Sequence, residues 1–249
     1  MNQLKILGVK VDNISKKEII EKVEDFLKED RLHQIATVNP EIILKAQEDD
    51  VLRNVLNRAT LCLADGVGIR FAFWRWGKHL KTRMAGADLM WRILEVANEK
   101  KLTVLLVASK MGLSNWEETR DAILKVYPDL KISGVNMDPL SGHFDRSIEL
   151  SGLSFKEGHI TYDVLFCNFG APYQEKFIAS LNRWSNWTCL AVGVGGSFDF
   201  ITDKITRAPK IMRIIGLEWL WRLLKQPRHR IKRIVKATIV FPIKVLFNK

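Results

Sequence analysis

A single aspartate, Asp65, follows the apolar run "TLCLA" and stands directly before a glycine. An Asp-Gly pair most often makes a turn, but a carboxylate in that position can also face a ligand and accept a proton from it. Three further stretches repeat the pattern, since each places polar or glycine residues directly after an apolar run. They are "TVNP" with Thr37 and Asn39, "NFGAPYQE" with Gln174, and "GVGGSFDF" with Gly195 and Gly196.

Each of these short motifs has a structural explanation beside the functional one. Asn39 before Pro40 could simply cap a helix, and "GVGGS" completes neither of the usual glycine-rich phosphate-binding motifs. Arg83, in "KTRMAGADL", could be a solvated surface residue. A guanidinium is also suited to the two phosphates of a pyrophosphate. The motifs are weak individually, and their shared position after apolar runs is what indicates a site.

Metal and covalent chemistry are not indicated by the motifs. The five histidines lack a metal-ligand spacing such as H-E-x-x-H, and neither D-x-D nor G-x-S-x-G occurs. The three cysteines lie in apolar runs without C-x-x-C spacing, which favours core packing. Metal-free chemistry at a phosphorylated or glycosyl substrate remains open, and we expect neither a metal nor another cofactor.

The residues above would be positioned by predicted strands and helices, which alternate along the chain. This alternation indicates βαβ units, and the fully apolar strands indicate a sheet covered on both faces. We predict an α/β fold, with a Rossmann-like, mainly parallel sheet that carries helices on both faces. Ligands of such sheets bind at the carboxyl ends of the strands, so the candidate residues are expected at one edge. Strands are expected at "KILGVKV", "HQIATVN", "TLCLAD", "TVLLVAS", "KISGVN", "DVLFCNFG" and "TCLAVGVGG", helices over 16–27, 40–57, 66–76, 87–100, 115–126 and 172–183, and a loop with one short helix over 138–161.

The net charge of +11 is concentrated at the C-terminal end. Residues 204–249 carry 13 Lys and Arg against one acid, whereas residues 1–203 carry 26 against 27. We predict a catalytic domain over 1–203 and a basic amphipathic helical appendage over 204–249, broken at Pro227 and Pro242. The appendage has no apolar run long enough to span a bilayer, but it could lie on one. The N-terminus shows no signal-peptide pattern, so a cytoplasmic location is expected.

Taken together and in order, the motifs resemble the WecG/TagA/CpsF family of bacterial glycosyltransferases. The resemblance runs from about Ile6 to about Arg228. It implies transfer of an N-acetyl-hexosamine from a UDP-sugar donor to a polyprenyl-diphosphate-linked sugar acceptor. The motifs that carry it are "TVNPEII", "ATLCLADGVGI", "RMAGADLM", "YPDLKISG", "NFGAPYQEKFI", "GVGGSFDFITDKITRAPKIM" and "GLEWLWRLLKQPRHR".

Within the family, the chain resembles the members that act in wall teichoic acid synthesis. This likeness implies inverting transfer of N-acetylmannosamine to N-acetylglucosaminyl-diphospho-undecaprenol. The family's proposed base matches Asp65, and its pocket residues match Thr37, Asn39, Arg83 and Gln174. Backbone N–H groups of "GVGGS", with Gly195 and Gly196, or of "GAPYQ" are expected to help bind the UDP pyrophosphate. Where the family usually has lysine in "GAPKQE", this chain has Tyr173.

A lipid-linked acceptor also gives the basic appendage a purpose. Lys and Arg residues near an anionic surface favour binding to it, so we expect peripheral association with the inner face of the cell membrane. The arginines expected to contact the membrane or the substrate diphosphates are Arg213, Arg222, Arg228 and Arg230. Alternatively, the apolar stripe with Trp219 and Trp221 packs against the body or a second subunit of a homo-oligomer.

Three alternative functions remain open from the sequence. The first is a transferase of the same family that uses another UDP-hexosamine or a uronic acid donor. The second is a Rossmann-like nucleic-acid-binding module, since a basic segment can also meet phosphates. Its basic residues are interleaved with Trp, Ile and Leu and do not surround a recognition helix, so we expect no nucleic acid partner. The third is an NAD-type enzyme, for which the glycine fingerprint is missing.

Overall fold

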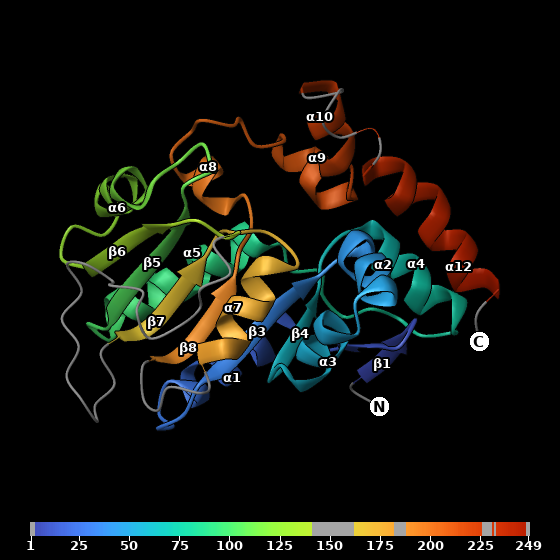
Figure 1. Cartoon of the computed structure of the whole chain (residues 1–249), viewed down its shortest axis with the longest axis horizontal. Helices are drawn as coiled ribbons and strands as arrows, with labels where there is room; N and C mark the ends of the chain where they lie inside the picture. Colours follow the sequence, from blue (N-terminus) through green and yellow to red (C-terminus); the bar gives the residue numbers. More distant parts are fainter. Residues whose placement is uncertain (1–2, 141–161, 182–187, 226–230, 232, 248–249) are drawn as a thin grey trace.

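Among the described residues, eight strands form one central sheet (Figure 1). The computed structural model describes residues 3–140, 162–181, 188–225, 231 and 233–247. The strand order is β1-β2-β4-β3-β8-β7-β5-β6, and all neighbouring strands are parallel except the β1–β2 pair. The strands are β1 (Gln3–Ile6), β2 (Val9–Asp12), β3 (His33–Val38), β4 (Leu61–Ala64), β5 (Thr103–Ser109), β6 (Lys131–Met137), β7 (Tyr162–Cys167) and β8 (Thr188–Gly193).

Helices cover both faces of this sheet, as predicted (Figure 1). One face packs against α1 (Lys16–Phe26), α5 (Gly86–Glu99), α6 (Trp116–Leu124) and α8 (Ser197–Ile201). The other packs against α2 (Pro40–Glu48), α3 (Asp50–Arg58), α4 (Val67–Arg75) and α7 (Tyr173–Leu181). The α/β, mainly parallel fold predicted from the sequence is therefore confirmed.

The alternation of buried side chains along β5 shows why its central residues, 104–108, are all apolar. Val104 and Leu106 pack on the α1–α5 side, whereas Leu105 and Val107 pack on the α7 side. Successive side chains of a strand point to opposite faces. A strand with helices on both sides must therefore be apolar at every position.

Two elements differ from the sequence-based expectation. The run "KILGVKV" is two antiparallel strands, β1 and β2, which turn at Leu7 and Gly8, both with positive φ. The helix expected over 40–57 is two helices, because Asp49 has extended backbone and its side chain accepts a hydrogen bond from Leu52 N at 3.0 Å. A residue that caps a new helix in this way cannot continue the previous one. The loop expected over 138–161 lies almost wholly outside the described residues.

From Lys210 on, the described part of the C-terminal segment is mainly helical. It contains α9 (Lys210–Ile215), α10 (Glu218–Lys225), a π-helical turn over Lys236–Val240, and α12 (Phe241–Phe247). Pro242 was expected to break the helix and does not, because the π-turn directly precedes it and widens the backbone where the proline lacks an N–H.

Helix α12 packs on the body of the molecule. Phe241 and Val245 are buried in the apolar cluster that also contains residues of α2 and α4. The boundary at residue 203 stays a prediction. No helix in the described part of the chain is long and apolar enough to cross a membrane.

Candidate active site

A cavity of about 390 Å³ lies at the carboxyl edge of the sheet. The four strands that end there, β4, β3, β8 and β7, are consecutive in the sheet, so the loops that follow them meet. Its volume falls in the range of small-molecule binding sites. Seven residues that the sequence analysis selected line it, and their chemical roles remain predictions: Thr37, Asn39, Asp65, Arg83, Gln174, Gly195 and Gly196.

Asp65 occupies the turn between β4 and α4. Its backbone N–H donates to Val38 O at 2.8 Å, which fixes the turn beside the end of β3. The next residue, Gly66, has a φ of +89°, a conformation that favours glycine. The side chain of Asp65 is half-buried at the cavity wall. The Asp-Gly pair is therefore both a turn and a cavity residue.

Thr37 and Asn39 come from the end of β3. Thr37 is buried, and Asn39 caps α2 by accepting a hydrogen bond from Ile42 N at 2.9 Å. The capping explanation for Asn39 is thus correct, and the residue lines the cavity as well. Capping holds its side chain in one orientation at the cavity wall.

Gln174 joins two of the loops that form the cavity. Its Oε1 atom accepts hydrogen bonds from Gly170 N at 3.1 Å and from Gly195 N at 2.9 Å. These two backbone N–H groups lie in the "GAPYQ" and "GVGGS" loops that were expected to bind pyrophosphate, and Gln174 already occupies them. The start of α5, formed by Gly86 and Ala87, also lines the cavity and has no side-chain cap.

Glu175 is the buried neighbour of Gln174. Gln174 Nε2 donates to Glu175 Oε1 at 2.8 Å, and burial raises the pKa of this carboxyl above its ordinary value. Tyr173, at the start of α7, is exposed to solvent. The first turn of α7 therefore places a neutral amide and a hard-to-ionise carboxyl behind the cavity.

Arginines gather around Asp88 on one side of the cavity. Arg207 Nη1 lies 2.8 Å from Asp88 Oδ1, and Arg213 Nη1 lies 3.9 Å from the same atom. Arg83 donates from Nη2 to the backbone carbonyl of Arg213. Arg207 belongs to the motif "TRAPK", but no role was predicted for it, because the sequence alone does not show that it lines the cavity.

The C-terminal segment covers the cavity. Glu218, Trp219 and Arg233 all line it. Arg233 holds the segment against α2 through Glu41, with Nε and Nη2 each 2.7 Å from Oε2. Burial of Glu41 acts to raise its pKa, but Arg233 and Lys45 outweigh it, so the pKa lies below its ordinary value.

The four arginines assigned to the membrane or to substrate diphosphates have different outcomes. Arg213 lies in α9 beside Asp88. Arg222 belongs to α10, and Arg228 and Arg230 lie outside the described residues. The apolar stripe of α10 is in part turned inward, since Trp219 lines the cavity and Trp221 Nε1 donates to Thr206 O at 3.2 Å.

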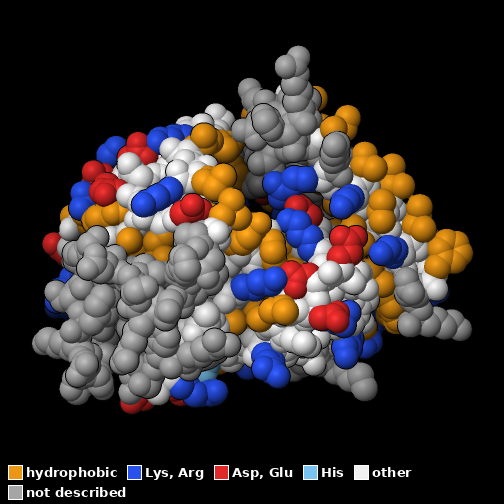
Figure 2. Space-filling model, viewed as in Figure 1, with side chains coloured by type: hydrophobic (Ala, Val, Ile, Leu, Met, Phe, Trp, Pro, Cys, Tyr) orange, Lys and Arg blue, Asp and Glu red, His pale blue; other side chains and the backbone are white. Residues whose placement is uncertain are grey.

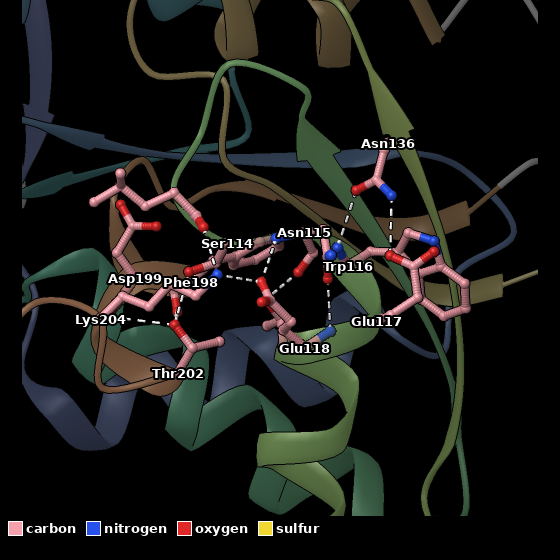
Figure 3. A network of polar contacts seen from close by, with 12 residues as sticks. Ser114, Asn115, Trp116, Glu117, Glu118, Asn136, Phe198, Asp199, Thr202 and Lys204 are labelled. Atoms are coloured by element: carbon pink, nitrogen blue, oxygen red, sulfur yellow. Dashed lines mark hydrogen bonds and ion pairs between the residues drawn. The ribbon is translucent and has the colours of Figure 1, made fainter.

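A polar network holds the chain between α8 and the C-terminal segment (Figure 3). Ser114 Oγ lies 2.7 Å from Thr202 Oγ1, and Lys204 Nζ donates to Leu113 O and to Glu118 Oε2. On the other side of α6, Asn136 bonds to Trp116 N and to Glu117. The network anchors residues 202–204, which directly precede the stretch of chain that carries Arg207.

Within the described residues, no group of three or more His, Cys, Asp or Glu side chains is arranged to hold a metal ion. The expectation of a metal-free reaction stays a prediction.

Comparisons with known proteins give one consistent result. A model of the glycosyl transferase WecG/TagA/CpsF family matches residues 4–249. A Bacillus subtilis (strain 168) protein named N-acetylglucosaminyldiphosphoundecaprenol N-acetyl-beta-D-mannosaminyltransferase is 32% identical over 193 residues, which cover 78% of this chain and 72% of that protein. A Staphylococcus aureus (strain MW2) protein of the same name is 28% identical over 242 residues, which cover 96% of this chain and 91% of that protein.

Proposed function

The chain belongs to the glycosyl transferase WecG/TagA/CpsF family, and we propose that it transfers N-acetylmannosamine from UDP to N-acetylglucosaminyl-diphospho-undecaprenol. The names of its relatives support this transferred sugar and this acceptor. The observation that carries the proposal is the cavity at the carboxyl edge of the sheet, whose wall includes Asp65 beside Thr37, Asn39 and Arg83.

In the proposed mechanism Asp65 is the general base. It takes the proton from the acceptor sugar hydroxyl as that oxygen attacks the anomeric carbon, and the bond to UDP breaks on the opposite face. The configuration therefore inverts. One carboxylate suffices because UDP is a good leaving group, whereas glycoside hydrolysis needs a second carboxyl to protonate a poor one. A positioned base contributes about 10²–10⁴-fold to the rate.

The charge that develops on UDP must be balanced as the bond breaks. Arg83 lines the cavity and could approach the diphosphate, and so could the backbone N–H groups at the start of α5. The proposed reaction uses no metal and no cofactor, in line with the lack of a D-x-D motif.

We also propose that the enzyme is peripheral to the inner face of the cell membrane. A row of hydrophobic side chains follows the edge of the molecule where the C-terminal helix lies (Figure 2). Together with the basic charge of this segment, such a face favours binding to an anionic bilayer. The exposed residues are Ile231, Val235, Ile239, Ile243, Leu246 and Phe247.

The test is product analysis with a short-chain lipid-diphosphate-N-acetylglucosamine acceptor and a panel of UDP-sugars. We expect turnover with UDP-N-acetylmannosamine and a product of inverted configuration by NMR. Asp65→Asn should lower turnover by about 10²–10⁴-fold while UDP binding persists. Asp129→Asn, at an exposed aspartate outside the cavity, is the matched control. Near-normal turnover of Asp65→Asn would refute the assignment of Asp65 as the base. Turnover with a different UDP-sugar and none with UDP-N-acetylmannosamine would refute the proposed donor.

A further inference from the structure

Arg207 approaches the cavity from the segment between α8 and α9. It lines the cavity, and the network around Lys204 anchors the chain three residues before it (Figure 3). Its guanidinium carbon lies 5.9 Å from the centre of the Phe200 ring. The side chain is 18% exposed. Its position is therefore fixed by neighbours on several sides.

The hydrogen bonding of Arg207 is one-sided. Nη1 is paired with Asp88, whereas Nε and Nη2 are buried and have no hydrogen-bond partner among the described residues. These two nitrogens form the side edge of the guanidinium, whose parallel N–H groups bind two oxygens of one carboxylate or phosphate. Buried donors without a partner are costly, so such an edge points to a ligand with paired anionic oxygens.

The charge around Arg207 favours the same kind of ligand. Arg213 also contacts Asp88, and its Nε is a further buried donor without a partner in the described part of the chain. Arg83 joins the group through the carbonyl of Arg213. Among the described residues, two guanidinium groups thus meet at the single carboxylate of Asp88, and that of Arg83 lies beside the backbone of Arg213. An anion of higher charge would offset their mutual repulsion.

We propose that Arg207 binds a substrate diphosphate through its Nε and Nη2 edge, while Asp88 holds the other side of the guanidinium. This inference rests on the proposed function, which supplies two such groups: the diphosphate of UDP and that of the lipid-linked acceptor. The sequence favoured Arg83 for this role, but its Nη2 group already donates to the backbone carbonyl of Arg213.

The experiment measures binding without turnover. Wild type, Arg207→Lys and Arg207→Gln are titrated calorimetrically with UDP and, separately, with a water-soluble short-chain prenyl diphosphate. Arg92→Gln is the matched control, because Arg92 lies on the exposed side of α5 with Glu95 as its partner. Thermal unfolding of each variant checks the fold, and Arg207→Lys keeps the charge if the glutamine variant is unstable.

Loss of the two-pronged contact should raise the Kd of one ligand by about 10–100-fold, with the smaller effect in the lysine variant. An effect on UDP assigns the donor diphosphate, and an effect on the prenyl diphosphate assigns the acceptor. If both folded variants bind both ligands as wild type does, Arg207 is not a diphosphate ligand, and the proposed function is untouched. If wild type itself binds neither ligand, the proposed function fails together with this inference.

Discussion

The first turn of α7 combines a structural amide with a buried acid. Gln174 bonds to the loops after β7 and β8 and also donates to Glu175. A Cβ atom at Gly193 would lie 2.6 Å from Gln174 Nε2, so that strand end accepts only glycine while Gln174 keeps this position. Gln174 and Gly193 therefore fix the relative position of the two cavity loops that follow β7 and β8.

Glu175 should make stability depend on pH in an unusual direction for a carboxylate. Burial raises its pKa above the ordinary value of 4.5. Between 4.5 and the raised pKa, the folded protein holds a proton that the unfolded chain releases. The contribution of this group to stability is thus complete below the ordinary value and is lost as the pH rises through the raised one.

The prediction is that Glu175→Gln gains stability relative to wild type as the pH rises from 5 to 8. The gain should be at most about 1.4 kcal/mol for each pH unit inside the window. Urea unfolding at several pH values measures it, and Glu95→Gln, at a solvent-exposed carboxyl, is the control. A constant difference between Glu175→Gln and wild type across this range would contradict the raised pKa.

At the scale of elements, α4 must approach α2 closely to place Asp65. A Cβ atom at Gly68 would lie 2.5 Å from Pro40 Cγ and 3.5 Å from a ring carbon of Phe241. The first turn of α4 therefore packs against both α2 and α12. Any side chain at position 68 would push apart the helices that begin at the cavity.

We expect Gly68→Ala to lower the free energy of unfolding by about 1–3 kcal/mol through overpacking. It should also lower kcat, because Asp65 stands at the start of the displaced helix. Chemical denaturation and steady-state kinetics measure the two effects. Arg70→Ala, at an exposed position of the same helix, should change neither. A free energy of unfolding and a kcat equal to those of wild type would contradict the prediction that Gly68→Ala displaces α4 and disturbs Asp65.

At the scale of the whole molecule, the C-terminal helix has two apolar faces. Phe241 and Val245 pack into the body, whereas Ile239 and Ile243 are exposed. The sequence analysis set packing on the body against membrane contact only for the stripe with Trp219 and Trp221. In this last helix the inward face packs on the body, and the outward face is available to a membrane.

The membrane prediction concerns this outward face. The double variant Ile239→Asp and Ile243→Asp should co-sediment with anionic vesicles several-fold less than wild type, because charged residues resist insertion. Activity on a water-soluble acceptor should persist. Val51→Asp, at an exposed apolar residue of α3, is the control. Equal sedimentation of the double variant and wild type would exclude this face as the contact.

The sequence by itself determined the α/β class, the order of most elements and seven of the residues that line the cavity. Apolar periodicity reports burial, and polar residues after buried strands must meet at one edge of a parallel sheet. Local conformation was harder to predict. The turn at Leu7 and Gly8, the new helix after Asp49, and the continuation of the helix through Pro242 depend on hydrogen bonds and backbone geometry that apolar periodicity does not encode.

Only the tertiary structure decided which hydrogen-bond donors around the cavity already have an acceptor within the protein. It showed that Gln174 accepts from two loop N–H groups and that Arg83 donates to the backbone of Arg213. It also showed that Arg207 Nε and Nη2 have no hydrogen-bond partner among the described residues. Hydrogen-bond satisfaction depends on atoms brought together from distant parts of the chain. For that reason the sequence could name Arg83 and Arg213 as candidates, but it could not show which of their donors are used, nor that Arg207 lines the cavity.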